Sequence, residues 1–418
     1  MADPLIVDFD HHAGGFLADR LSGWRTMRAT PVAYTPCHGG FWVVSGYDQV
    51  AQVSRDEATF SSLFGDLGGV RCRGIAGVPR PRGIPPAGIA EAEARMHQNL
   101  RRVLTPYLMP PAVEALRPLA GALTTWFLDE RMASGRMDLV ADLTNPVPAI
   151  VTMRLVGLPV EDWRYYAELF HATVAYRPGS DEHNAALSGV PEMMASLLAE
   201  VRSRRSRPRD DMLSALVAVR DGDGRRLDDE TVGSVLWNLV GGGLDTTTSL
   251  TSLSLFHLGA HPEQRCRLVE NPGLIPVATE EFLRYFSVNE TLTRTVTCET
   301  TLAGQKLSPG DVVLLSWLSA NHDEGVFPRS DEVVLDRAPN RHLAFGVGAH
   351  RCIGMHVARA LFQTMVSGVL ARIPDYRIDL DATRFYEGNP MLAGAVCMPV
   401  TFTPGARTGP AAPPLALG

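Results

Sequence analysis

Apolar residues recur at every third or fourth position through much of the chain, the spacing that places them on one face of a helix. The longest such run, from Asp228 to Gln264, is apolar nearly all round, which predicts a helix that crosses the core. Shorter amphipathic helices are predicted for YDQVAQVSRD from Tyr47, AEARMHQNLRRVLTPYL from Ala92, AVEALRPLAGALTTWFLDERMAS from Ala112 and PEMMASLLAEVRSRRS from Pro191.

Fewer segments have the β-branched composition of strands. GGFWVVSG from Gly39 and GDVVLLSW from Gly310 are β-rich, and TLTRTVTCETTLAGQKLS from Thr291 predicts strands joined by turns. The fold is therefore expected to be mainly α with a small β region.

The long central helix contains an anomaly in its middle. Gly241, Gly242 and Gly243 occur in a row, and Asp245 and Thr246 follow closely. Each interior glycine costs a helix about 1 kcal/mol relative to alanine. One interpretation is a break between two helices, or close packing against a neighbour. The other is a locally widened turn, in which the glycines let a flat ligand approach the backbone and a freed carbonyl accepts the Thr246 hydroxyl.

No stretch of the 418 residues has the composition of a linker between domains. The segment richest in glycine and proline, Gly65–Glu91, carries apolar residues throughout and is interpreted as a long loop inside one domain. The residues from Gly405 onward are small and proline-rich. We expect one domain over 1–404 and a flexible tail over 405–418.

The net charge of −7 and the lack of a basic block argue against a nucleic-acid binder. The N-terminus has no signal peptide or membrane anchor pattern. The six cysteines form no CxxC pair, which indicates neither a zinc site nor a disulfide framework: Cys37, Cys72, Cys266, Cys298, Cys352 and Cys397. We therefore expect a cytoplasmic protein without a membrane segment.

One cysteine lies in an unusual setting. In AFGVGAHRCIGMHVARALF, from Ala344, Cys352 stands among Gly346, Gly348 and Gly354, and a helical pattern follows. A cysteine in a glycine-rich loop at a helix N-terminus is expected to have a stabilised thiolate, which suits a soft metal such as haem iron. A buried structural role is the alternative for a lone cysteine.

The whole string FGVGAHRCIG, from Phe345 to Gly354, resembles the haem-binding loop of the cytochromes P450, FGxGxHxCxG, with every fixed position present. VGGGLDTTT resembles the oxygen-activating groove of that family's central helix, and FWVVSGYDQVAQVSRDEATFSS resembles its N-terminal strand and helix. The resemblance implies the cytochrome P450 fold, a triangular helical body around a buried haem b. It also implies Cys352 as the iron ligand, with Phe345, Gly346, Gly354 and Gly242 against the haem.

Two further sets of residues follow from the resemblance. EEFLRYF supplies the family's ExxR pair as Glu281 and Arg284, and Arg337 is the expected third member of that buried ion-pair cluster. The haem propionates are expected to meet cationic groups, for which arginine forks are well suited: His97, Arg101, Arg294 and His350. The residues before His97 lack the Asp-Pro-Pro turn that the family has at the start of this helix.

The implied reaction is insertion of one oxygen atom from O2 into a small organic substrate. Asp245 and Thr246 would deliver protons through water during oxygen activation. We expect a bacterial secondary-metabolite tailoring hydroxylase or epoxidase, with the 62–94 loop as a lid. The candidate pocket residues are Asn238, Gly241, Val288, Asn289, Thr291 and Leu392. Glu290 is expected to point to solvent. The alternative is that it faces the substrate, which would make the pocket more polar than that of a hydrocarbon hydroxylase.

The chain carries no flavin, nicotinamide or iron–sulfur fingerprint, so the electrons are expected from a ferredoxin and a ferredoxin reductase. Arg101, Arg102, Arg351 and Arg359 could form a basic patch for an acidic ferredoxin, and we expect a monomer. Two alternatives remain. One is a P450-type enzyme that couples or cyclises its substrate without oxygen insertion, and the other is a non-catalytic haem sensor. The Asp245–Thr246 pair argues against both.

Overall fold

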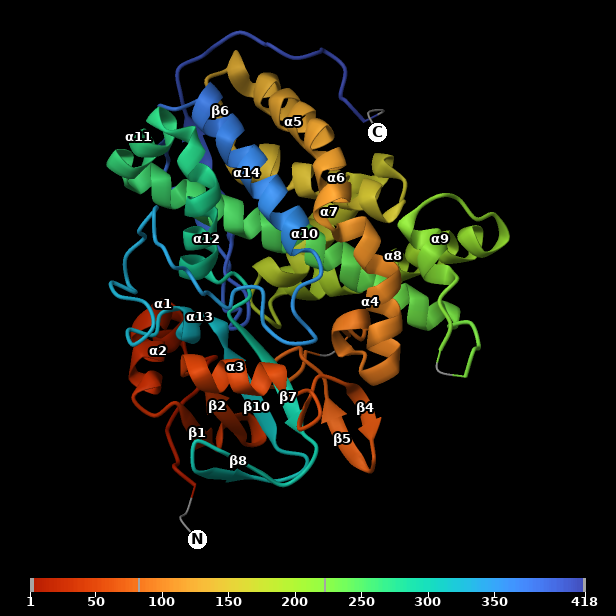
Figure 1. Cartoon of the computed structure of the whole chain (residues 1–418). Coiled ribbons are helices and arrows are strands. Elements are labelled where there is room, and N and C mark those ends of the chain that lie inside the picture. Colours follow the sequence, from red (N-terminus) through yellow and green to blue (C-terminus); the bar gives the residue numbers. More distant parts are fainter. Residues whose placement is uncertain (1–3, 82, 222, 416–418) are drawn as a thin grey trace.

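A helical body, crossed by the long central helix α10 (Asp229–Ala260), lies next to a smaller β-rich part (Figure 1). The computed structural model describes residues 4–81, 83–221 and 223–415. No described helix is long and apolar enough to cross a membrane. The other helices of the body are α4 (Ala94–Leu108), α5 (Pro110–Met132), α6 (Pro146–Val156), α7 (Trp163–Ala175), α8 (Asp181–Ser206), α9 (Met212–Val217), α11 (Pro262–Glu270), α12 (Ile275–Phe286) and α14 (Met355–Arg372).

The β-rich part is built on a five-stranded sheet of order β1-β2-β10-β7-β3, with the helices α1, α2, α3 and α13 around it. β2 and β10 run parallel, and the other neighbours are antiparallel. The elements are α1 (Gly14–Ala18), α2 (Arg20–Arg28), β1 (Val32–Thr35), β2 (Phe41–Val44), α3 (Tyr47–Arg55), β3 (Phe60–Ser61), β7 (Thr291–Val296), β10 (Val312–Ser316) and α13 (Trp317–Asn321).

Short elements complete the fold. The small strands are β4 (Phe64–Leu67), β5 (Val70–Arg73), β6 (Arg136–Asp138), β8 (Thr300–Leu302), β9 (Gln305–Leu307), β11 (Arg377–Ile378), β12 (Arg384–Phe385), β13 (Ala395–Cys397) and β14 (Pro399–Thr401). The single helical turns are η1 (Cys37–Gly39), η2 (Gly88–Glu91), η3 (Val140–Thr144), η4 (Val160–Asp162) and η5 (Pro272–Leu274).

The sheet is buried on both faces, which explains why β2 and most of β10 are continuously apolar instead of alternating with polar residues. In β2, Trp42 and Val44 belong to one core cluster, while Phe41 and Val43 belong to another on the opposite face. Successive side chains of a strand point to opposite faces, so both sets must be apolar. The predicted strands β2, β7, β8, β9 and β10 are confirmed.

The central helix is buried along most of its length in the largest core cluster, as predicted. It ends at Ala260, because Pro262 begins α11, so the predicted extension to Gln264 is wrong. The helix is continuous through Gly241–Gly243, so the interpretation as two helices separated by a break is also wrong. Its buried face packs against α6, α8 and α14, and that packing offsets the low helix propensity of the glycines.

Part of the segment predicted to be a long loop forms a hairpin. β4 and β5 pair antiparallel between Phe64 and Arg73, and β5 also lies next to β7. Exposed positions dominate this hairpin, so no apolar alternation marks it in the sequence.

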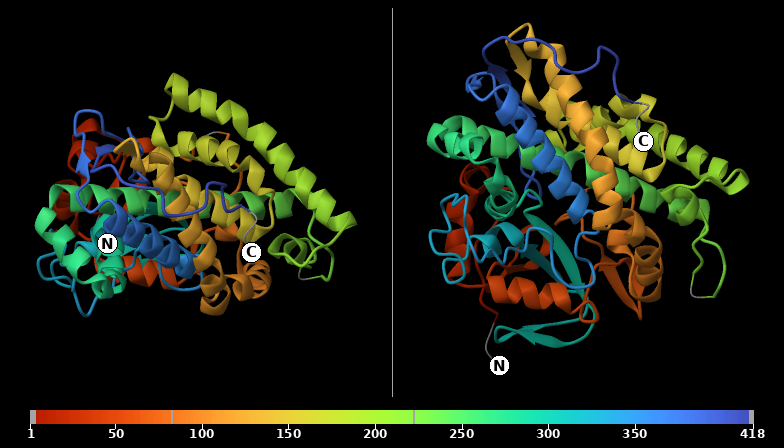
Figure 2. Two further views of the ribbon diagram at one scale, coloured as in Figure 1. Left: turned by 90° about the horizontal axis from the view of Figure 1, so that it is seen from above. Right: turned by 45° about the horizontal axis from the view of Figure 1, so that its top comes forward.

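The described part of the C-terminal tail, residues 405–415, lies along α5 (Figure 2). Thr408 and Gly409 donate backbone hydrogen bonds to the Asp129 carboxylate, at 3.0 and 2.6 Å. The indole N–H of Trp126 donates to the Ala411 carbonyl. Residues 405–415 therefore have specific partners, while 416–418 of the predicted tail lie outside the described residues.

Candidate active site

A cavity of about 330 Å³ lies between the middle of α10, the start of α4 and the loop before α14. Its lining brings together residues that are far apart in the sequence. Of those singled out above, it includes His97, Arg101, Asn238, Gly242, Thr246, Val288, Asn289, Arg294, Phe345, Gly346, His350, Cys352 and Gly354.

The loop that carries Cys352 is held in shape by its own backbone. The Cys352 N–H donates to the Phe345 carbonyl at 2.8 Å. Gly346 and Gly348 have φ of +65° and +84°, which L-residues with side chains rarely adopt. A Cβ on Gly348 would also meet the Ser54 carbonyl oxygen at 2.5 Å. The glycines are therefore required by the backbone conformation and by close contact with α3.

Cys352 has a high exposed area, but that surface faces the cavity, which it lines. Burial among protein atoms raises the pKa of its thiol, against the lowering influence of the Gly354 N–H and the charge of Arg101. Burial therefore opposes the stabilisation of the thiolate that the glycine-rich loop was expected to give. A bound metal ion reverses this balance, because a coordinated thiol is deprotonated.

Four cationic or proton-donating side chains converge on the Cys352 side of the cavity. The rings of His97 and His350 lie against each other with centroids 4.2 Å apart and their planes tilted by 33°. Burial, and then the charge of Arg101, lowers the pKa of His97 to about 4. Burial, and then the charge of His97, lowers the pKa of His350 to about 3. Burial also lowers the pKa of Arg294 to about 10. The carboxylate that contacts this group is that of Glu57, which lies 3.7 Å from His350 Nε2.

This cluster fits an anionic, flat group such as haem. The His350 Nδ1 atom is buried without a hydrogen-bond partner, and its Nε2 lies 3.1 Å from the Ser62 hydroxyl. Buried polar atoms normally have partners, so an orphaned nitrogen beside cationic groups points to a missing acceptor. Two carboxylates on the edge of a planar ring would supply both the acceptors and the charge.

The wall of the cavity opposite Cys352 is the glycine-rich part of α10. A Cβ on Gly241 would meet the Phe170 ring at 2.6 Å, and one on Gly243 would meet the Thr152 side chain. Nothing lies within 4 Å of a Cβ on Gly242. Two of the glycines thus serve close packing, while the third leaves open space on the cavity side. The Thr246 hydroxyl donates to the Gly242 carbonyl at 2.8 Å.

Asp245 lies on another side of the helix from the cavity lining and is held in a polar network. The His171 Nδ1 atom is 2.9 Å from its carboxylate, and the Tyr386 hydroxyl donates to its two oxygens at 2.7 and 2.8 Å. The Ser249 hydroxyl is 3.1 Å from that of Tyr386. Burial, and then the charge of Asp245, holds the pKa of Tyr386 well above its ordinary value, so its hydroxyl remains a donor.

The ion-pair cluster is buried behind the loop. Arg284 donates to both Glu281 carboxylate oxygens at 2.8 and 2.9 Å, and Arg337 donates to one of them at 2.8 Å. Glu281 and Arg284 have no exposed side-chain area. Burial raises the pKa of Glu281, but the hydrogen bonds and charge of Arg284 outweigh it and hold that pKa below its usual range.

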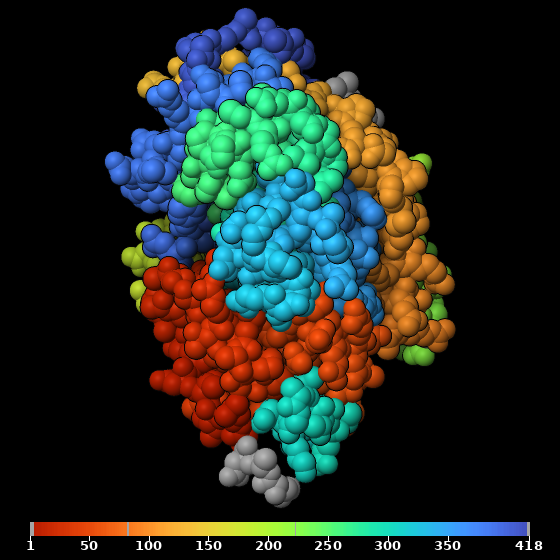
Figure 3. Space-filling model, turned by 60° about the vertical axis from the view of Figure 1, so that its left-hand side comes forward, coloured from red at the N-terminus to blue at the C-terminus, as the bar shows by residue number. Residues whose placement is uncertain are grey.

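A chain of contacts links this cluster to the Cys352 loop. Arg284 donates to the Asn321 carbonyl, and the Asn321 side chain accepts the Leu343 N–H at 2.6 Å. The Leu343 carbonyl in turn accepts the Gly346 N–H. The segment after α13 that carries these contacts packs between the N-terminal part and α11 (Figure 3).

A second acidic residue also supports the loop and was not predicted. Glu280 pairs with both ends of the Arg359 fork at 2.7 Å, and the Arg359 guanidinium lies 4.7 Å from the Phe345 ring centre. Burial raises the pKa of Glu280, but Arg359 and then His342 lower it to about 2. Arg359 is therefore already compensated, which leaves Arg102 and Arg351 as the exposed members of the predicted arginine patch.

Among the pocket candidates, Asn238, Val288 and Asn289 line the cavity, whereas Gly241, Thr291 and Leu392 are not part of its lining. The Thr291 hydroxyl donates to the Pro390 carbonyl, and Leu392 packs against the main core.

The prediction that Glu290 points to solvent is wrong. Its side chain is 3% exposed, and one carboxylate oxygen lies 2.8 Å from Arg20 Nη1 as an ion pair. Burial raises the pKa of Glu290 against the charge of Arg20. Arg20 is far away in the sequence, so the pattern around Glu290 could not reveal it.

Comparison with known proteins agrees with a site that fits haem. The family model for Cytochrome P450 matches residues 162–272 and 274–373. Cytochrome P450-SU2 of Streptomyces griseolus is 34% identical over 310 residues, 73% of this chain and 75% of the relative. Mycinamicin IV hydroxylase/epoxidase of Micromonospora griseorubida is 30% identical over 96% of this chain and 99% of the relative. A structure of Mycobacterium marinum cytochrome P450 CYP268A2 with pseudoionone has a TM-score of 0.85 at 27% identity, covering 96% of this chain and 100% of that one.

Proposed function

The chain belongs to the cytochrome P450 family, and we propose that it is a haem-thiolate monooxygenase inserting one oxygen atom from O2 into a small organic substrate. The observation that carries this proposal is the cavity itself. Cys352 lines it on one side, and Thr246 with the open Gly242 lines it on the other. The family binds haem b through a cysteine thiolate, and the residues present fit that group.

The residues have separate roles. Cys352 Sγ would hold the haem iron, and His97, Arg101, Arg294 and His350 would hold the propionates. The bound haem supplies the redox chemistry that activates O2. Glu281, Arg284 and Arg337 keep the Cys352 loop in place through the contacts with Asn321.

We propose that Thr246 and Asp245 handle protons in the site. Thr246 lines the cavity and can bind water there, while Asp245 lies within hydrogen-bond reach of His171 and Tyr386. The His171 side chain is 12% exposed, so the network extends from Asp245 towards the surface. A proton can then be held at the Asp245 carboxylate and passed inward through water to the Thr246 hydroxyl.

The proposed substrate class is a secondary metabolite, modified by hydroxylation or epoxidation. The relatives support this class: one is named as a mycinamicin IV hydroxylase/epoxidase and another as a nocardicin C N-oxygenase. The cavity mixes apolar side chains such as Val288 and Leu239 with the amides of Asn238 and Asn289. Such a lining suits a largely apolar substrate with a few polar groups.

We propose a ferredoxin, reduced by its reductase, as the electron donor. The exposed Arg102 and Arg351 of the predicted arginine patch support contact with an acidic partner. We also propose that the chain works as a cytoplasmic monomer. The six cysteines are free, as expected in a reducing compartment.

Substitution of Thr246 by alanine should uncouple the reaction. The variant should bind haem and substrate as the wild type does, yet consume reductant and release peroxide instead of product. The measurement is product formed per reduced nicotinamide consumed, with a substrate found by its shift of the Soret band. A purely helical role for Thr246 predicts a lower melting temperature with unchanged coupling.

In the same experiment, Asp245→Asn should slow the proton step and raise the solvent isotope effect on turnover. Tyr386→Phe removes one donor to that carboxylate and should produce a smaller change in the same direction. Thr364→Ala is a matched control, because that hydroxyl bonds to a carbonyl within α14, away from the cavity lining. An isotope effect that moves equally in the control would contradict the role of Asp245.

A further inference from the structure

Three histidines meet beside β1 of the five-stranded sheet, outside the site described above. His11 and His12 precede α1, and His38 lies in η1 between β1 and β2. One potential ligand atom from each ring lies within 4.8 Å of the other two. The ring centroids of His12 and His38 are 4.8 Å apart, and those of His11 and His12 are 4.3 Å apart.

His11 is the residue that calls for an explanation. It has no exposed area, and neither of its ring nitrogens has a hydrogen-bond partner. The Val78 carbonyl lies near His11, but the side-chain hydrogen bond that it makes is with His12 Nε2, at 2.9 Å. A buried polar group without a partner points to a water or ion that completes it.

The other two rings are held as metal-binding histidines usually are. His12 uses Nε2 towards the Val78 carbonyl, and His38 uses Nε2 towards the Asp10 carboxylate at 2.7 Å. Histidine ligands almost always donate their second ring N–H to a carbonyl or carboxylate, which fixes the ring and leaves the other nitrogen for the metal. In both residues that remaining atom is Nδ1.

We propose that His11, His12 and His38 bind one divalent first-row transition metal ion, with Zn²⁺ as the ion best suited to the site. Imidazole nitrogens suit Zn²⁺, Cu²⁺ and Ni²⁺, and three of them with water form a four-coordinate zinc site. Zn–N bonds of about 2.0–2.1 Å require the rings to close around the ion by small rotations. The exposed position of His38 gives the ion a path of entry.

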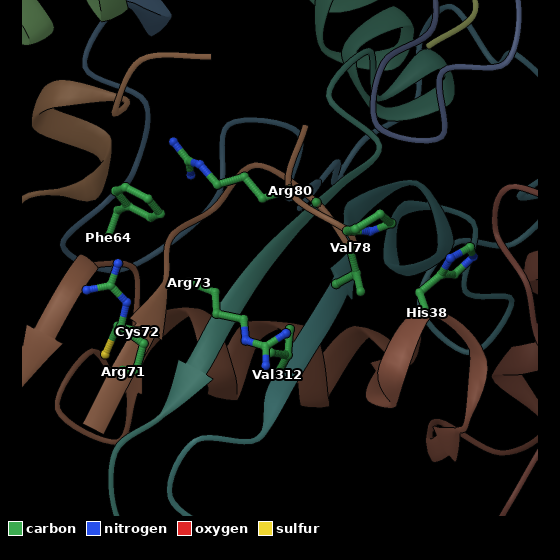
Figure 4. Close-up of a pocket in the computed structure, with 10 residues that line it drawn as sticks. His38, Phe64, Arg71, Cys72, Arg73, Val78, Arg80 and Val312 are labelled. Atoms are coloured by element: carbon green, nitrogen blue, oxygen red, sulfur yellow. The ribbon is translucent and has the colours of Figure 1, made fainter. Parts of the chain in front are cut away.

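The ion would join three segments of the chain. His11 and His12 anchor the N-terminal segment, His38 anchors the turn between β1 and β2, and the His12 bond to Val78 reaches the 62–94 segment. Figure 4 shows His38 and Val78 at the same end of a pocket whose other end holds Phe64 and Arg71. Ile75, three residues before Val78, lines the large cavity. Metal binding should therefore restrain the part of this segment that borders the cavity.

Zinc binding to the untagged, haem-loaded protein tests the site. The protein is treated with a chelator, dialysed against known Zn²⁺ concentrations and analysed for zinc and for haem iron, which counts the molecules. The wild type should hold one zinc per haem. His12→Gln and His38→Gln should each weaken binding by about tenfold or more, and the double variant should hold none. Unchanged Soret spectra would show that these variants remain folded.

The control variant is His261→Gln. His257 and His261 stack with centroids 4.0 Å apart on neighbouring helical turns and form a histidine pair outside the proposed site. This variant should bind zinc as the wild type does. Absence of stoichiometric zinc, or zinc lost with His261→Gln but kept with His38→Gln, would overturn the proposal. Either result would leave His11 as a neutral histidine packed between Phe9 and Phe41.

Hydrogen exchange tests the coupling to the 62–94 segment. Zinc should slow amide exchange in the peptide that contains residues 74–79 of the wild type, and it should have no effect on this peptide in His38→Gln. Equal exchange with and without zinc in the wild type would contradict the restraint. The outcome is independent of the proposed monooxygenase reaction, because it requires neither substrate nor reductant.

Discussion

Glu281→Ala is expected to yield protein with little or no bound haem. The substitution leaves Arg284 buried and without its carboxylate partner, and it also removes acceptors from Arg337, Asn340 and the Val334 N–H. Loss of one partner of a buried ion pair destabilises a protein by about 3–5 kcal/mol. Because Arg284 reaches the Cys352 loop through Asn321, the loss should disturb the haem side of the cavity first.

The measurement is the ratio of Soret absorbance to total protein after purification. Glu270→Ala removes an exposed carboxylate from α11 and is the control that should keep full haem content. Full haem incorporation in Glu281→Ala would refute the supporting role of the cluster.

The cluster also predicts a direction for pH dependence. The pKa of Glu281 is lower in the folded protein than in the unfolded chain. Its contribution is therefore present above the ordinary carboxyl pKa and is lost as the pH falls through the lowered value. Haem should remain bound through the neutral range and be released only in acid.

Cys352→Ala should abolish the absorption band at about 450 nm of the reduced carbon monoxide complex, which is the mark of thiolate ligation in this family. Cys352 is the one cysteine that lines the large cavity among the residues described. The band should survive when Cys72, whose side chain is buried outside the cavity lining, is replaced. A band that persists in Cys352→Ala and disappears in another cysteine variant would show that a different sulfur holds the iron.

The helices, the main strands and much of the lining of the site could be predicted, because their sequence patterns lie within single continuous segments. The periodicity of α10 extends over a continuous segment, and the glycine pattern around Cys352 is confined to one loop. The resemblance of the chain to a known family also predicted the contact between Glu281 and Arg337. These residues are distant in the chain, and their side chains lie 2.8 Å apart in the structure.

Contacts between distant segments without such a motif could not be predicted. The partner of Glu290 is Arg20, and the partners of Asp245 are His171 and Tyr386. These residues stand in segments whose own patterns indicate only helix or loop. The same holds for the histidine cluster, because His38 reaches His11 and His12 only after the N-terminal segment has packed beside β1.

Incorporation of isotope from ¹⁸O₂ tests the central claim most directly. A compound that shifts the Soret band is supplied to the protein with reduced ferredoxin under ¹⁸O₂ in ordinary water, and the product is analysed by mass spectrometry. The account predicts a product that carries one ¹⁸O atom. An oxidised, coupled or cyclised product without ¹⁸O would contradict it and would identify the chain as a P450 enzyme that does not insert oxygen.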